Sequence, residues 1–180
     1  MLASEAQRDF SDWNNNPGAE LVGYLYEYRE LVPIGFLETV TERALSSIRI
    51  SNKPYPQYYF LEALCILRLA ARIDEPFKTE IINRINADIF EIIETDQIKW
   101  ATTYSAKPFF FAHAPIGPIF DSIKDHVLRS LENEIKTQSD EGNFILNWSV
   151  QDEESSRTWK SIWTLEALRA LHHHGMIASI

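Results

Sequence analysis

The chain has 180 residues, of which 45% are apolar, and its formal net charge is −9 at pH 7. A chain of this length can bury a substantial core, and its apolar content excludes an intrinsically disordered protein. The excess of acidic residues argues against binding to nucleic acids or to anionic membranes, because both need a basic surface. The sequence shows no export signal and no apolar stretch long enough for a membrane span. We therefore expect one acidic, soluble, cytoplasmic domain over residues 1–180.

Two helices are predicted on either side of an early proline and glycine break. A capping box at residues 4–7 opens the first helix, and residues 14–18 end it. The second helix is predicted over residues 19–31, and Gly23 within it would let a neighbouring helix approach closely. The spacing of apolar residues predicts an inward face made of Leu21, Leu25, Tyr28 and Val32.

Residues 58–73 are predicted to form an inner helix, because apolar side chains cover almost every direction around it. Glu62, Arg68 and Arg72 are its only charged residues. The single cysteine, Cys65, lies within this helix and is predicted to be a small buried hydrophobe.

An amphipathic helix is predicted on each side of this inner helix, one beginning near Ile34 and the other covering residues 77–94. When the sequence is aligned with itself so that Phe36 coincides with Phe77, later apolar positions of the two helices also coincide. A period of about 40 residues is typical of helical hairpin repeats. The predicted inward residues are Phe36, Leu37, Val40, Ala44, Leu45 and Ile48 in the first helix, and Ile81, Ile82, Ile85, Ile89, Ile92 and Ile93 in the second, with Asp88 outward.

Helical periodicity ends between residues 100 and 120, where three prolines, one glycine and six aromatic rings occur. A loop this apolar either covers an opening in the core or lines a ligand pocket. Lys107 within it needs a carboxylate or an anionic ligand, unless its side chain extends to solvent. If the segment lines a pocket for an apolar or anionic-headed ligand, the candidate ligand-binding residues are Tyr104, Lys107, His113, Trp148, Trp159 and Trp163.

The C-terminal third begins with a predicted helix over residues 121–136, whose inward residues are Ile123, Val127, Leu128, Leu131 and Ile135. The alternation over residues 144–150 predicts a short extended segment with one buried face. A last helix carries Trp159, Ile162, Trp163, Leu165, Leu168 and Leu171 and stops at Gly175. Three consecutive histidines precede that glycine. They point in different directions around a helix, so we interpret His172, His173 and His174 as complementing the helix dipole rather than binding one metal ion.

Residues 138–144 match the Q-x3-G-x-W pattern of the QW repeat, with Phe144 in the place of the tryptophan. The glutamine amide can satisfy free backbone groups at a helix end, and Gly142 permits a tight turn. The repeat is typical of terpene cyclases and, more loosely, of protein prenyltransferases, which are α/α-toroids. The chain resembles a group of bacterial proteins related to these toroids, and the resembling stretches include ELVGYLYEY, YYFLEALCILRL, AKPFFFAHAP, GNFILNW and WKSIWTLEALRALHHHGMI.

The resemblance implies an all-α fold, an α/α-toroid-like array of helical hairpins that forms a closed ring or an open arc. A dimer that covers an exposed inner face is a further arrangement. The acidic D-x-D-D motif of the related cyclases is absent, and no Asp and His stand at recognisable spacing from Cys65 for zinc. We therefore expect no catalytic residues, no metal and no cofactor.

The function predicted first is a non-catalytic module that binds an apolar or isoprenoid-like small molecule or a protein partner, with a homodimer as one form of partnership. Two alternatives stay open. One is an isoprenoid-related enzyme that needs residues from outside this chain, and the other is a helical-repeat scaffold for protein interaction.

Overall fold

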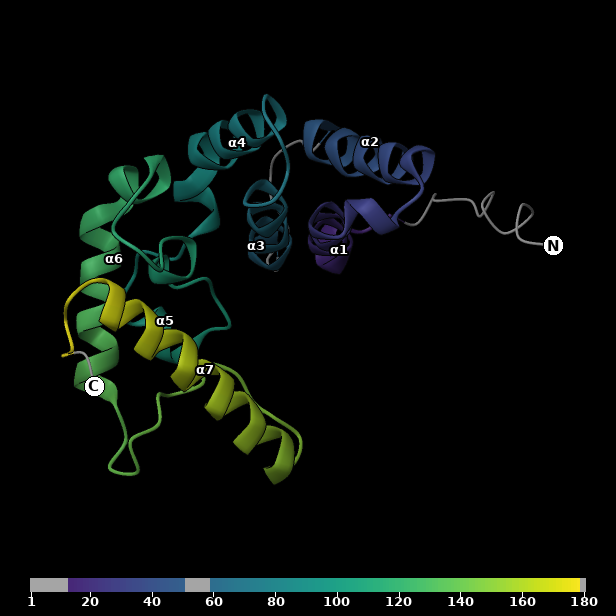
Figure 1. Ribbon diagram of the computed structural model, residues 1–180. Coiled ribbons are helices and arrows are strands. Elements are labelled where there is room, and N and C mark those ends of the chain that lie inside the picture. The colour runs from purple at the N-terminus through teal and green to yellow at the C-terminus, as the bar shows by residue number, and fades with distance from the viewer. Residues whose placement is uncertain (1–12, 51–58, 179–180) are drawn as a thin grey trace. The chain divides into compact units, whose positions relative to one another are not determined.

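The structure is a computed structural model that describes residues 13–50 and 59–178. Within these ranges the secondary structure consists of seven α-helices and two short 3-10 helices, and it contains no strand (Figure 1). The all-α prediction is confirmed. The capping box predicted at residues 4–7 lies outside the described residues, and the ring-like arrangement of the hairpins stays a prediction.

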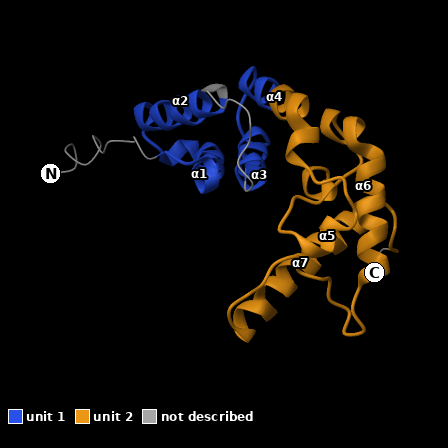
Figure 2. Cartoon of the chain, turned by 180° about the vertical axis from the view of Figure 1, so that it is seen from behind, with its two compact units in different colours: residues 1–81 blue, residues 82–180 orange. Residues whose placement is uncertain are grey.

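The chain divides into two compact units, residues 1–81 and residues 82–180, and the division falls within one helix (Figure 2). Unit 1 contains α1 (Asn15–Glu27), the 3-10 helix Arg29–Leu31, α2 (Ile34–Ile50), α3 (Tyr59–Ala70) and the start of α4 (Phe77–Ile92). Unit 2 contains the rest of α4 and the helices that follow it. The single domain expected over the whole chain stays a prediction.

Helix α1 begins at Asn15, earlier than predicted, because the Asn14 side chain accepts a hydrogen bond from the backbone N–H of Asn16 at 2.8 Å. The inward face predicted for this helix is wrong. Leu21 and Tyr28 are 55% and 62% exposed, and the buried residues of the helix are Asn15, Ala19, Val22 and Gly23. Small side chains make the contact because α1 packs closely against α3.

Gly23→Ala is expected to lower the free energy of unfolding by about 1–3 kcal/mol, because it overpacks this contact. A Cβ atom at position 23 would lie 3.1 Å from Cδ of Arg72, 3.2 Å from Cα of Leu69 and 3.3 Å from the carbonyl oxygen of Arg68. Two of these atoms belong to the backbone of the neighbouring chain segment, so the two segments must move apart.

Chemical denaturation of the variant, with Gly35→Ala in α2 as the matched control, tests this expectation. A Cβ atom at Gly35 meets nothing within 4 Å, so there the higher helix propensity of alanine should stabilise the protein. Equal stability of the two variants would contradict the close contact at Gly23.

Helix α3 is the inner helix of unit 1, as predicted, and Arg68 is its only exposed residue. The Arg68 guanidinium lies 2.7 Å from Oε2 of Glu20 on α1. Cys65 is 4% exposed, which confirms it as a small buried residue. Burial raises the pKa of the Cys65 thiol to about 11, and the nearby Glu20 carboxylate adds to the shift.

Helices α2 and α4 have the predicted amphipathic pattern, with three differences. Phe36 is 45% exposed, Ile82 is only half-buried, and Asp88 is buried although its position predicted an outward side chain. Asp88 is accommodated because its carboxylate lies 3.1 Å from Nε of Arg84, one turn earlier on the same helix. The order helix, turn, helix thus occurs twice, as the repeated spacing predicts.

Unit 2 continues with α5 (Lys99–Thr102), the 3-10 helix Pro108–Phe111, α6 (Pro118–Thr137) and α7 (Glu153–His173). The apolar segment between α4 and α6 is largely irregular, as predicted, and it buries the three phenylalanines of its 3-10 helix. It therefore covers the core of unit 2.

Two positions of α6 differ from the expectation. The helix begins at Pro118 rather than Asp121, and Ile135 is 44% exposed although it was expected to face inward. The neighbouring Glu134 is buried instead.

The segment 144–150 has no helix and no strand, although it follows the predicted alternation in part. Phe144 is buried and Ile145 is 43% exposed, but Asn147 is buried where an outward residue was expected. Its side-chain amide donates a hydrogen bond to the carbonyl oxygen of Ser105 at 3.3 Å, which explains its inward position.

Candidate functional site

Four of the six predicted ligand-binding residues form an aromatic cluster in unit 2, with Trp148 at its centre. The Trp148 ring centroid lies 5.2 Å from that of Tyr104, 5.7 Å from that of Trp159 and 5.1 Å from that of Trp163. All three contacts are edge-to-face, which is the favourable geometry for aromatic pairs. The structure therefore brings together residues from the apolar segment, the segment 144–150 and α7.

Lys107 also contacts this cluster, with its Nζ atom over the Trp163 ring at 5.7 Å from the ring centroid. Lys107 is 3% exposed, so the alternative in which its side chain extends to solvent is wrong. Its ammonium lies 2.5 Å from Oε1 of Glu134, a residue of α6 that is fully buried. The carboxylate that a buried cation needs is thus supplied by the protein itself.

Burial raises the pKa of the Glu134 carboxyl, and the neighbouring Lys107 ammonium opposes this rise. Glu134 was not predicted as part of the site. The spacing of α6 carried a signal for its burial, because Glu134 lies three residues after Leu131 and seven after Val127, on the predicted inward face.

His113, the sixth predicted residue, meets α7 at Glu166, where its Nε2 atom lies 3.1 Å from Oε2. Its ring also contacts Phe109, with the two centroids 6.4 Å apart. The six predicted residues therefore all lie in unit 2. Their role in lining a ligand pocket stays a prediction.

The turn after α6 has the glycine conformation that was predicted, but the Gln138 amide bonds within the turn and not to a backbone group of the helix end. The Gln138 side-chain amide donates a hydrogen bond to the carbonyl oxygen of Gly142 at 2.8 Å, directly after the last residue of α6. Gly142 has a φ of 84°, a left-handed conformation that favours glycine. Phe144 is 1% exposed, and its backbone N–H donates to the Thr164 hydroxyl on α7 at 3.3 Å. These contacts hold the turn against α7.

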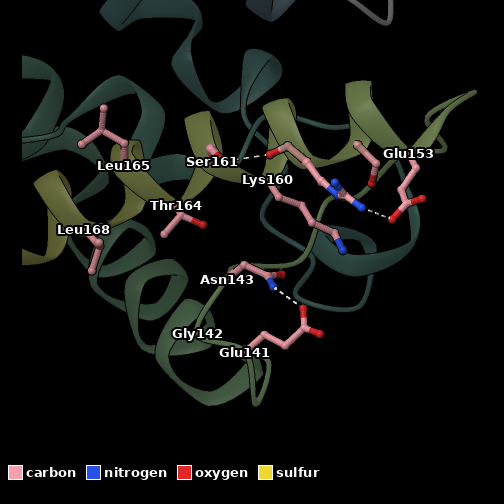
Figure 3. A pocket seen from close by; sticks show the side chains of 11 residues that line it. Glu141, Gly142, Asn143, Glu153, Lys160, Ser161, Thr164, Leu165 and Leu168 are labelled. Atoms are coloured by element: carbon pink, nitrogen blue, oxygen red, sulfur yellow. Dashed lines mark hydrogen bonds and ion pairs between the residues drawn. The ribbon is translucent and has the colours of Figure 1, made fainter.

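An open groove of about 920 Å³ lies between this turn and α7 (Figure 3). Its size falls within the range of small-molecule sites. Polar and apolar side chains both contribute to its walls, and the lining residues are Glu141, Gly142, Asn143, Glu153, Ser156, Arg157, Lys160, Ser161, Thr164, Leu165 and Leu168. We call this the α7 groove.

Most polar groups of the α7 groove already have partners within the protein. Arg157 pairs with Glu153, and the Ser161 hydroxyl donates to the carbonyl oxygen of Arg157 at 2.9 Å. Glu141 accepts a hydrogen bond from the Asn143 amide at 3.3 Å.

Lys160 differs from these groups. Among the residues that the structure describes, it forms no ion pair, and its side chain extends from α7 toward the turn (Figure 3). Leu165 and Leu168 lie at the end of the groove away from Glu153, and they are 57% and 38% exposed (Figure 3). The groove thus combines an apolar end with Lys160, a cation that forms no ion pair within residues 13–50 and 59–178.

The α7 groove was not predicted from the sequence. One signal was present, because the apolar residues of α7 occur on more than one face of the helix. Ala167, Ala170 and Leu171 form the buried face, whereas Leu165 and Leu168 lie on another.

Comparison with known proteins finds no matching family model, no matching curated protein and no matching solved structure. The resemblance to α/α-toroids therefore stays a prediction, and the class that the fold defines is an all-helical protein. In the described ranges, no helix has both the length and the apolar character that crossing a membrane requires. No group of three or more His, Cys, Asp or Glu side chains within those ranges is arranged to hold a metal ion.

Proposed function

We propose that the protein is a non-catalytic binding module whose α7 groove holds an apolar small molecule with an anionic head group. The observation that carries this proposal is the combination of Lys160, a cation without an ion pair among the described residues, with two exposed leucines in one groove. A ligand of this chemistry uses both ends of the groove at once.

The apolar part of the ligand would cover Leu165 and Leu168. Removing exposed apolar surface from water is favourable by about 25 cal/mol per Å², so covering these side chains supplies binding free energy without any change in the fold. The head group would lie against Lys160, where a charge-assisted hydrogen bond fixes its orientation. Glu141 lies on the opposite wall and disfavours a second negative charge.

Dodecanoate is a suitable probe, because it has one carboxylate and an apolar chain. We expect Lys160→Glu to weaken dodecanoate binding by about 10- to 100-fold, which corresponds to the loss of one charge-assisted contact. Isothermal titration calorimetry measures this change. Lys124→Glu, which alters an exposed residue of α6 outside the groove, is the matched control and should bind as the parent does.

Glu141→Gln tests whether the Glu141 carboxylate opposes an anionic head group in the groove. It removes the opposing carboxylate, so it should strengthen dodecanoate binding. The proposal would be contradicted if the Lys160→Glu and Lys124→Glu variants bound dodecanoate equally well. It would also be contradicted if the parent protein did not bind dodecanoate.

Farnesyl diphosphate is the second probe, and it tests the isoprenoid-related alternative. Its head group carries more than one negative charge, which Glu141 opposes, so we expect it to bind more weakly than dodecanoate. Binding without release of diphosphate supports a binding module. Release of diphosphate would instead favour the isoprenoid-related enzyme.

A further inference from the structure

The charged end and the apolar end of the α7 groove are connected by one row of side chains along the helix. Lys160, Thr164 and Leu168 follow one another at intervals of four residues, and this spacing places them on the same face of α7 (Figure 3). A helix rises about 1.5 Å per residue, so Lys160 and Leu168 lie about 12 Å apart along the helix axis. A single helix therefore fixes the distance between the cation and the last apolar side chain of the groove.

The row ends at Leu168 because the next position on this face of the helix is buried. Leu171 follows three residues later and is 2% exposed, whereas Leu168 is 38% exposed. Leu168 is also the last residue of α7 that lines the groove. A ligand chain that extends past Leu168 therefore continues into solvent and gains no further contact in the groove.

The turn after α6 closes the floor of the groove between Lys160 and Leu168. The Thr164 hydroxyl, in the middle of the row, accepts a hydrogen bond from the backbone N–H of Phe144 at 3.3 Å. The Phe144 side chain is buried, so the turn is anchored at this point. A ligand chain would thus follow the row along the helix instead of entering between the turn and α7.

We propose that the α7 groove selects medium-chain carboxylates of up to about ten carbons, and that Leu168 is the residue that sets this limit. Carbon–carbon bonds of about 1.5 Å advance an extended chain by about 1.3 Å per carbon, so about nine or ten carbons span the row. This inference rests on the proposed function, because it names the length of ligand that the same groove would hold.

Isothermal titration calorimetry of the full chain with hexanoate, octanoate, decanoate, dodecanoate and tetradecanoate tests the length limit. Each methylene group that the groove covers should strengthen binding by about two- to fourfold. We expect this gain to continue up to decanoate. Dodecanoate and tetradecanoate should then bind within about twofold of decanoate, because their additional carbons remain in solvent.

Leu168→Ala tests the role of this side chain. The variant should weaken decanoate binding by about five- to tenfold and hexanoate binding by less than about twofold, because the hexanoate chain ends before it reaches Leu168. A purely structural effect would weaken both ligands equally. Leu31→Ala is the matched control, because Leu31 is 83% exposed and lies outside the groove, and it should bind every carboxylate as the parent does. Circular dichroism shows whether each variant keeps its helices.

The possible results separate this inference from the proposed function. Affinity that rises by the same factor from decanoate to tetradecanoate would overturn the length limit and leave the proposed function intact. Equal losses of hexanoate and decanoate affinity in Leu168→Ala would overturn the role of Leu168. If none of the five carboxylates binds the parent protein, the proposed function fails and the length limit fails with it.

Discussion

Lys107→Met is expected to lower the free energy of unfolding by about 3–5 kcal/mol, because it leaves a buried carboxylate without its cation. Lys107 is 3% exposed and Glu134 is fully buried, so water reaches neither charge. The Oε2 atom of Glu134 has no hydrogen-bond partner among the described residues, and the carboxylate therefore relies on the Lys107 ammonium. Chemical denaturation at neutral pH measures the loss.

The double variant Lys107→Met with Glu134→Leu is the matched control, because it removes both charges and keeps similar volumes. It should recover most of the lost stability, as replacement of buried ion pairs by apolar residues often does. Equal stability of the single and double variants would show that the cost comes from packing and not from an uncompensated charge.

The single variant should also respond to pH in a defined direction. Burial raises the pKa of Glu134 above its usual range and the Lys107 ammonium opposes this, so loss of the ammonium raises that pKa further. A group with a raised pKa in the folded state gives its full contribution to stability at low pH, and the contribution is lost as pH rises through the folded pKa. The stability deficit of Lys107→Met should therefore shrink on acidification and grow toward neutral pH.

Phe144→Ala is expected to cost about 3–5 kcal/mol, the usual range for removing a buried phenylalanine. Phe144 is 1% exposed and stands at the end of the turn that begins with Gln138. Loss of its ring leaves a cavity where this turn meets α7. Because the turn forms one wall of the α7 groove, we also expect weaker dodecanoate binding.

Ile145→Ala is the control for this position. Ile145 is the next residue along the chain and is 43% exposed, so its truncation should change the free energy of unfolding by no more than about 0.5 kcal/mol. If thermal or chemical denaturation gave the same loss for both variants, Phe144 would not be the residue that anchors the turn.

The sequence predicts the helices well where their apolar residues follow one strict period. Helices α2, α3 and α4 lie within a few residues of their predicted positions for this reason. In α1, the large residues Leu21 and Tyr28 are exposed, and Gly23 faces the partner helix. Hydrophobicity alone does not reveal where two backbones approach each other, so the face of α1 was predicted wrongly.

The sequence indicated which residues to consider for the candidate site, but it did not indicate how they are arranged in space. Trp148 contacts three other aromatic residues that the sequence singled out, whereas their role in binding a ligand stays a prediction. Lys107, however, is paired with Glu134, 27 residues later on another element, and a single sequence offers no signal for such a distant pairing. The α7 groove depends on the position of a turn beside a helix, and only the packed chain defines that space.

The buried thiol of Cys65 has a practical consequence for labelling experiments. With a pKa of about 11, only about one molecule in ten thousand carries the thiolate at neutral pH, and the thiolate is the form that reacts with maleimides and disulfides. A cysteine introduced at an exposed position such as Thr158 can therefore accept a fluorophore or spin label while the native thiol is left in place.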